Sequence, residues 1–163
     1  MRLRLIRAGY QLAWVALWLL SPLHRGRGRG VKGILSHEGR VLLVQHTYGP
    51  RRWEIPGGGL RRGEEPIDGV RREIREELGV ELPQPTLIAI GSGPGREPRR
   101  QMTYFAAELA VEQVTPDPRE IARAQWHDPT ALPAALGEHV ARAIDLWRAA
   151  ASSPPGISQR LGP

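Results

Sequence analysis

The sequence has 163 residues, which is enough for one domain with a single hydrophobic core. Its 40% hydrophobic and 25% charged residues are typical of a globular protein, and the absence of cysteine excludes disulfides, thiolate metal sites and thiol nucleophiles. The net charge of +6 suggests nucleic-acid binding. However, all seven charged residues before Gly33 are basic, whereas the remainder of the chain has 16 basic and 17 acidic residues. The body of the chain after residue 32 is therefore nearly neutral.

Residues 8–23 form a mostly apolar run that follows three arginines. The run is shorter than the roughly 20 residues of a membrane-spanning helix, and no small-x-small cleavage site follows it. Three interpretations stay open: an interfacial helix on anionic lipid, a helix docked on its own domain, and a membrane anchor or signal. Residues 25–30 (RGRGRG) indicate a flexible linker. We therefore expect residues 1–30 to be a basic, apolar helix and a linker.

The next segments alternate between strand and turn patterns. Residues 31–36 and 40–46 predict two strands around a turn, and residues 53–56 predict a short extended piece that leads into a turn of three glycines. Residues 65–78 predict a helix, because Pro66 lies in its first turn and Gly79 follows as a C-terminal cap.

Three further elements are predicted in the second half of the chain. Residues 87–92 and 101–109 predict strands around a loop at residues 93–100, and residues 124–127 predict a short last strand. Residues 138–151 predict a helix, and residues 152–163 a disordered tail. The elements predict an α/β (α+β) domain over residues 31–151, with a sheet covered by helices on two faces.

Three glutamates in the central predicted helix lie on one face. Glu73, Glu76 and Glu77 stand at positions i, i+3 and i+4, which brings their carboxylates within one helical turn. A solvated, charged helix face would show the same three residues. If they are partly buried they require a compensating cation, and clustered carboxylate oxygens suit a hard ion such as Mg²⁺. The glycines that precede the helix allow the backbone to approach a ligand closely.

Residues 58–80 resemble the Nudix box, the signature of the Nudix hydrolases. The pattern is Gly, five residues, Glu, seven residues, then Arg-Glu-aliphatic-any-Glu-Glu-any-Gly-aliphatic. The chain matches every position, with Gly58, Glu64, Arg72, Glu73, Ile74, Glu76, Glu77, Gly79 and Val80. The flanking residues 41–44 and 53–57 are also similar, and the resemblance extends over residues 31–147. Many members have a pair of alanines where this chain has Gly69 and Val70, so Gly69 either permits close packing or marks a kink.

The resemblance implies a Nudix-like α/β/α sandwich, here with an added N-terminal helix. It also implies hydrolysis of a phosphoanhydride bond in a nucleoside diphosphate linked to another group, with Mg²⁺ or Mn²⁺ as cofactor. Carried over by position, Glu73, Glu76 and Glu77 are the expected metal ligands. Glu64 is expected to be an outer ligand or an ion-pair partner of Arg72.

The resemblance leaves the general base open between Glu73 and Glu120. We expect the substrate to contact a set of glycines and arginines before and after the helix. The set is Arg52, Gly57, Gly58, Gly59, Arg99 and Arg100. For His46, Tyr48 and Trp53 we expect packing rather than contact with a base or sugar.

Two functions other than a hydrolase are compatible with parts of the sequence. A nucleotide-sensing module would keep the fold without catalysis, but the intact glutamates argue against it. A membrane-associated adaptor would depend on residues 1–29, which on our interpretation affect only location or solubility. We expect a cytoplasmic enzyme that acts on a small nucleotide, since the nearly neutral body lacks a basic face for RNA. Peripheral membrane contact through residues 1–29 and a homodimer stay open, and no nucleic-acid partner is expected.

Overall fold

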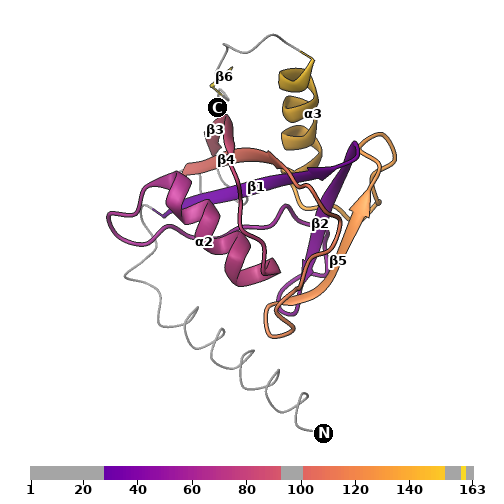
Figure 1. The fold of residues 1–163 in the computed structure, drawn as a ribbon, viewed down its shortest axis with the longest axis horizontal. Coiled ribbons are helices and arrows are strands. Elements are labelled where there is room, and N and C mark those ends of the chain that lie inside the picture. The colour runs from indigo at the N-terminus through magenta and orange to yellow at the C-terminus, as the bar shows by residue number, and fades with distance from the viewer. Residues whose placement is uncertain (1–27, 93–100, 153–158, 161–163) are drawn as a thin grey trace, which may run out of the picture.

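The computed structural model describes residues 28–92, 101–152 and 159–160, which form one sheet with helices on two sides (Figure 1). The elements in chain order are β1 (Arg29–His37), β2 (Arg40–His46), α2 (Pro66–Leu78), β3 (Thr86–Ser92), β4 (Gln101–Glu108), β5 (Ile121–His127), α3 (Val140–Ala151) and β6 (Gln159–Arg160). Neither of the helices among these residues has the length and apolar character needed to cross a membrane.

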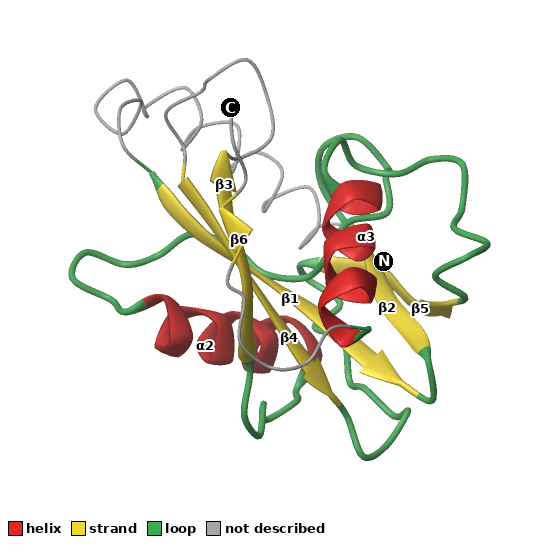
Figure 2. Cartoon of the chain, turned by 90° about the horizontal axis from the view of Figure 1, so that it is seen from above, coloured by secondary structure: helices red, strands yellow, loops and turns green. Residues whose placement is uncertain are grey.

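The described strands form a mixed sheet in the order β5-β2-β1-β4-β3-β6. Strand β1 pairs in parallel with β4, while β1 with β2, β2 with β5, and β3 with β4 pair antiparallel. Helix α2 contacts β1 and β4, whereas α3 contacts β3, and Figure 2 shows the two helices on opposite sides of the sheet. The predicted α/β/α sandwich is therefore confirmed.

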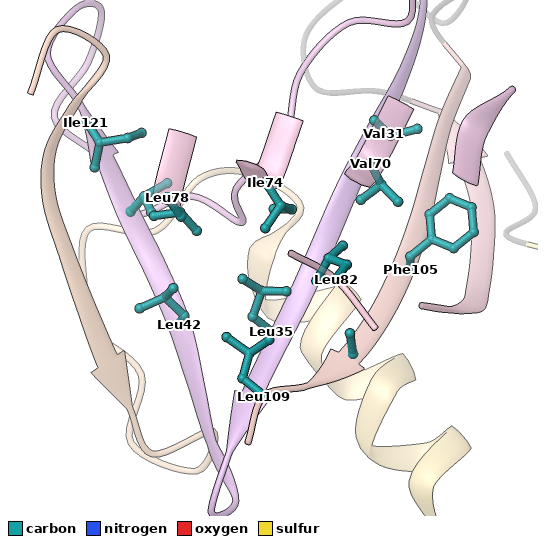
Figure 3. Packing of buried hydrophobic residues seen from close by; sticks show 12 residues of the cluster. Val31, Leu35, Leu42, Val70, Ile74, Leu78, Leu82, Phe105, Leu109 and Ile121 are labelled. Atoms are coloured by element: carbon teal, nitrogen blue, oxygen red, sulfur yellow. The ribbon is translucent and has the colours of Figure 1, made fainter. Parts of the chain in front are cut away.

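The rotation of α2 about its axis is fixed by an apolar stripe. Val70, Ile74 and Leu78 recur every four residues and are completely buried against the sheet (Figure 3). Burial of side chains of this size stabilises the fold by about 2 kcal/mol each. Because Glu73 and Glu77 are neighbours of this stripe on the helix surface, packing of the stripe also sets where their carboxylates lie.

A segment between β2 and α2 fills the space where β1 and β2 diverge. The two strands pair in register only near their hairpin, at Ser36 with Val41 and at His37 with Arg40. Farther along, Gly33 N–H donates to the carbonyl of Pro56 and Val31 N–H donates to that of Gly58, both at 2.9 Å. The glycine loop, residues 57–59, therefore lies along β1 on the side from which β2 diverges.

Helix α3 begins at Val140 rather than at residue 138, and two strand boundaries differ from the predictions by two or more residues. Strand β1 begins at Arg29, inside the predicted linker, because Leu60 N–H donates to the Arg29 carbonyl at 2.9 Å and β4 pairs with Arg29 on the other side. Strand β5 begins at Ile121 rather than at residue 124, since Ile121 is buried and pairs with His46. Pairing across the sheet extends both strands beyond their local sequence signal.

The structure also differs from the predicted disordered tail at Gln159–Arg160. The backbone of these two residues forms β6 beside Ala89 and Ile90, because β3 would otherwise leave an unpaired sheet edge. The remainder of the tail after Ser152, the predicted N-terminal helix and the loop at residues 93–100 lie outside the described residues.

Gly69 serves close packing rather than a kink. Helix α2 is continuous through this position, and a Cβ on Gly69 would collide with the side chain of Leu60. The loop that precedes the helix therefore packs directly on the backbone of α2.

Candidate active site

The central acidic cluster lies on α2, whose ends are well defined. Pro66 occupies the first turn, and the helix ends at Gly79, which has a left-handed φ of 66° and donates its N–H to the Arg75 carbonyl. Three glutamates on this helix differ strongly in exposure. Glu77 is 3% exposed, the side chain of Glu73 is 14% exposed and that of Glu76 is 46% exposed. Their environments therefore differ as well, although they lie within one turn.

Glu77 is buried beneath the glycine loop. Its Oε2 accepts the backbone N–H of Gly57 at 2.8 Å. Burial raises the pKa of Glu77 to about 7, against the opposing effects of the positive charge of Lys32 and of this hydrogen bond. A carboxylate in such a position is stabilised in its charged form by any further cation that reaches it.

Glu73 lies against the next glycine of the loop. A Cβ on Gly58 would be only 2.6 Å from Oε2 of Glu73, so no larger residue fits there without moving the carboxylate. Burial raises the pKa of Glu73, although the hydrogen bond from Arg72 lowers it. The loop glycines thus provide the room in which the two least exposed carboxylates meet the backbone.

Arg72 joins the acidic residues of the loop and the helix. Its guanidinium donates two hydrogen bonds to Glu64, at 2.7 and 2.8 Å, and it also donates from Nη1 to Glu73 at 2.7 Å and to Glu76 at 3.1 Å. Hydrogen bonding with Arg72 lowers the pKa of Glu64 to about 2. Of the two roles expected for Glu64, the structure shows the ion pair.

Glu120 approaches the cluster from the turn before β5. This turn is tied to the end of α2, because Thr115 N–H donates to the Leu78 carbonyl at 2.8 Å and Asp117 N–H donates to the Glu77 carbonyl at 2.9 Å. Burial raises the pKa of Glu120, and the negative charges of Asp117, Glu73 and Glu76 raise it further. Tertiary contacts therefore bring a fourth carboxylate to the three on the helix.

Comparison with known proteins shows the family of this chain. The model of the NUDIX domain family matches residues 24–147, which is most of the chain. The chain belongs to the Nudix family. The resemblance predicted from the Nudix box is thereby confirmed.

Similar Nudix proteins include enzymes with different named substrates. The chain is 30% identical over 146 residues to an RNA pyrophosphohydrolase of Bartonella henselae, covering 70% of this chain and 82% of that protein. It is 34% identical over 100 residues to the NAD-capped RNA hydrolase NudC of Vibrio atlanticus, covering 61% of this chain and 36% of that protein. This chain thus spans about a third of the length of the Vibrio protein.

A solved structure has the same fold. The MutT NUDIX hydrolase from Burkholderia pseudomallei superposes with a TM-score of 0.68 at 23% identity, covering 75% of this chain and 98% of that one. At this identity the similarity establishes the Nudix fold and leaves the activity to be argued from the site.

The acidic residues of the Nudix box fit a divalent metal ion in their donor chemistry. Carboxylate oxygens are the donors that Mg²⁺ and Mn²⁺ prefer, and burial, followed by the charges of neighbouring acids, raises the pKa of Glu120. Within residues 28–92 and 101–152, however, no three acidic or histidine side chains converge closely enough to form a ready metal cage. In this arrangement the guanidinium of Arg72 binds the carboxylates of Glu73 and Glu76.

The predicted substrate-binding residues that the structure describes lie in two places. Gly57, Gly58 and Gly59 line the backbone path between β1 and α2, and Gly59 also accepts a hydrogen bond from Arg72 at 3.0 Å. Arg52 is exposed beside the buried Trp53. Arg99 and Arg100 lie outside the described residues.

Aromatic residues near the site follow the prediction of packing in part. Trp53 is buried in the core under α3 and contacts the ring of His127, as expected. His46 and Tyr48 stack on each other, with ring centroids 5.1 Å apart. Burial raises the pKa of Tyr48 to about 12, and the charges of Glu77, Glu120 and Glu73 add to this effect, so Tyr48 borders the acidic cluster.

Sequence reasoning missed Lys32. Its ammonium donates to the carbonyls of Ile55 at 2.7 Å and Gly57 at 3.1 Å, immediately behind the glycine loop. The available signal was a lysine in the middle of an otherwise apolar strand pattern.

Proposed function

We propose that this chain is a divalent-metal-dependent hydrolase that cleaves a phosphoanhydride bond in a nucleoside diphosphate-linked substrate. The observation that carries the proposal is the grouping of four carboxylates beside the glycine loop, in a member of the Nudix family. The four residues are Glu73, Glu76, Glu77 and Glu120. Their mutual repulsion has little use in a structural element, but it suits a site that receives a cation and a diphosphate.

The surroundings of each residue indicate its role in the reaction. Glu73, Glu76 and Glu77 would hold Mg²⁺ or Mn²⁺, which when bound neutralises diphosphate oxygens and acidifies a water molecule. The glycine loop presents backbone without side chains, so a diphosphate can approach it closely. Arg52, exposed beside Trp53, is a candidate for phosphate contact.

Glu120 is the better of the two candidate general bases. Its pKa is raised by burial and by the neighbouring acids, which favours proton uptake by this carboxylate. The carboxylate of Glu73 instead receives a hydrogen bond from Arg72, which opposes protonation. We therefore propose that Glu120 accepts the proton from the attacking water and that Glu73 binds the metal.

For the substrate we favour a small nucleoside diphosphate derivative, such as a nucleotide sugar or ADP-ribose. The body of the chain is nearly neutral, whereas an RNA-binding surface needs a concentrated basic face. RNA 5′ ends form the second candidate class, because the names of the Bartonella and Vibrio relatives refer to RNA substrates.

The experiment is a substrate panel with matched glutamine variants. Wild type, Glu76→Gln, Glu77→Gln and the control Glu81→Gln, which changes an exposed acid beyond the helix, are incubated with nucleotide sugars, ADP-ribose, nucleoside triphosphates and capped RNA. Each reaction contains Mg²⁺ or Mn²⁺, and products are separated by chromatography. We expect at least a hundredfold loss of turnover in the first two variants and none in the control.

The same panel separates the alternatives. Unchanged turnover in both helix variants would refute the proposal. Nucleotide binding without turnover in the wild type, measured by calorimetry, would identify a sensing module instead. Turnover of capped RNA alone would move the substrate to the second class.

For the N-terminal arm we propose a role in location rather than catalysis. Strand β1 begins at Arg29, so a deletion of residues 1–27 leaves the pairing of β1 with β4 intact. We expect the shortened chain to keep its turnover and to lose sedimentation with phosphatidylserine vesicles. Loss of turnover in a folded deletion variant would instead favour the adaptor hypothesis.

A further inference from the structure

The 163-residue sequence contains a single lysine among 22 arginines, and this lysine lies in the sheet. Lys32 is in β1 between the buried residues Val31 and Gly33, and its own side chain is partly buried. Val31 and Leu35 face α2, whereas Ile34 belongs to the core under α3, so strand alternation places Lys32 on the side away from α2. From that side its ammonium reaches the carbonyls of Ile55 and Gly57.

Lys32 and Glu77 both form hydrogen bonds with Gly57, on opposite sides of its backbone. The ammonium of Lys32 donates to the Gly57 carbonyl at 3.1 Å and to the Ile55 carbonyl at 2.7 Å. The N–H of Gly57 donates to Glu77 at 2.8 Å. A charged donor makes a hydrogen bond roughly twice as strong as a neutral donor does. The ammonium of Lys32 is therefore a strong constraint on the Gly57 carbonyl.

Steric constraints leave Gly57 little freedom to adjust. Its φ of 125° lies in a region that other residues rarely adopt, and a Cβ there would collide with the Val31 carbonyl. An ammonium is compact and has three rotatable donors, whereas the planar guanidinium of arginine has a fixed fork. Two carbonyls separated by one proline are suited to the lysine, which gives a physical reason why a chain that otherwise uses arginine has lysine here.

We propose that Lys32 is a positioning residue that orients the carboxylate of Glu77 by fixing the Gly57 peptide from the opposite side of the loop. The proposal rests on the proposed function only in treating Glu77 as a metal ligand. The charge of Lys32 also acts directly on Glu77, since it lowers the pKa of that carboxyl. On this proposal the effect of Lys32 on metal binding depends on the presence of the Glu77 carboxylate.

A double-mutant cycle tests this dependence. Wild type, Lys32→Met, Glu77→Gln and the double variant are titrated with Mn²⁺, and free Mn²⁺ is measured by electron paramagnetic resonance. Methionine keeps the apolar stem of lysine and removes its charge and donors. We expect Lys32→Met to weaken Mn²⁺ binding about tenfold in the native background and less than twofold when Glu77 is already glutamine. The same weakening in both backgrounds would overturn the proposal.

Two further variants complete the design. Arg142→Met removes an exposed cation from α3, across the sheet, and we expect it to leave Mn²⁺ binding unchanged. Lys32→Arg keeps the charge but not the compact donor, so we expect partial rescue of Mn²⁺ affinity, and kcat reduced more than KM is raised. If Lys32→Met fails to fold, Lys32→Gln takes its place in the cycle.

Failure of the proposed function gives a different result from failure of this inference. If Glu77→Gln leaves Mn²⁺ binding unchanged, the metal role of Glu77 is wrong. The same four proteins are then compared by urea unfolding without metal. Losses in the unfolding midpoint that are not additive would support the positioning of Glu77 by Lys32, and additive losses would overturn it.

Discussion

The guanidinium of Arg72 binds the carboxylate of Glu64 through two hydrogen bonds, from Nε to Oε1 at 2.7 Å and from Nη2 to Oε2 at 2.8 Å. Both side chains are nearly buried, with 9% and 13% of their surface exposed. This pair connects the loop after the three glycines to the helix that carries the metal-binding candidates. It supplies these acidic residues with an internal cation.

Removal of Arg72 is expected to destabilise the fold strongly. In Arg72→Met the carboxylates of Glu64 and Glu73 keep their burial but lose their cation, which costs about 3–5 kcal/mol for a buried pair. Urea unfolding without metal measures the effect. The neighbouring Arg71→Met is the control, since its pair with Asp68 is exposed and should change stability by less than about 1 kcal/mol. Equal losses in the two variants would contradict this account.

Gly57 is expected to tolerate no side chain. Gly57→Ala places a Cβ against the Val31 carbonyl at a φ of 125°, so we expect a loss of at least about 2 kcal/mol in unfolding free energy. Gly63→Ala is the matched control, because Gly63 also has a positive φ of 77° but open space around it. The control should lose about 1 kcal/mol. A smaller loss at Gly57 than at Gly63 would show that the loop can move away from β1.

Glu120→Gln is expected to lower kcat by about 100-fold or more, the usual contribution of a general base. Burial raises the pKa of Glu120, and a base must be deprotonated to work, so wild-type kcat/KM should fall as the pH drops through this raised pKa. The fall should disappear in the variant. Glu112→Gln changes an exposed acid paired with Arg40 and should leave the pH profile intact. An acidic limb that persists in Glu120→Gln would direct attention to Glu73.

His46 is expected to make the fold sensitive to acid. Burial, followed by the positive charge of Lys32, lowers the pKa of His46 from its usual 6.5 to about 4. Between these values the unfolded chain binds more protons than the folded one, so stability is complete above pH 6.5 and falls as the pH approaches 4. At pH 4 this effect of His46 lowers the free energy of unfolding by about 3 kcal/mol. Unfolding curves of wild type and His46→Phe, which keeps a ring beside Tyr48, should diverge over this range, and parallel curves would exclude the effect.

The sequence by itself determined most of the elements and the family. The spacing of Glu73, Glu76 and Glu77 follows from the helical period, and an apolar residue every fourth position faces the sheet, so both can be read from neighbours in the chain. The Nudix box adds the glycines and Glu64 at fixed intervals. These features are local, which is why the central helix, the glycine turn and most strands agree with the predictions.

Tertiary structure decided how the individual acids differ. Nothing in the spacing indicates that Glu77 is buried while Glu76 is exposed, or that Glu64 pairs with Arg72. Glu120 joins the cluster only because the turn before β5 bonds to the end of α2. Lys32 reaches Gly57 only because the loop lies between diverging strands. These relationships depend on burial and on contacts between residues distant in sequence, and a one-dimensional pattern contains neither.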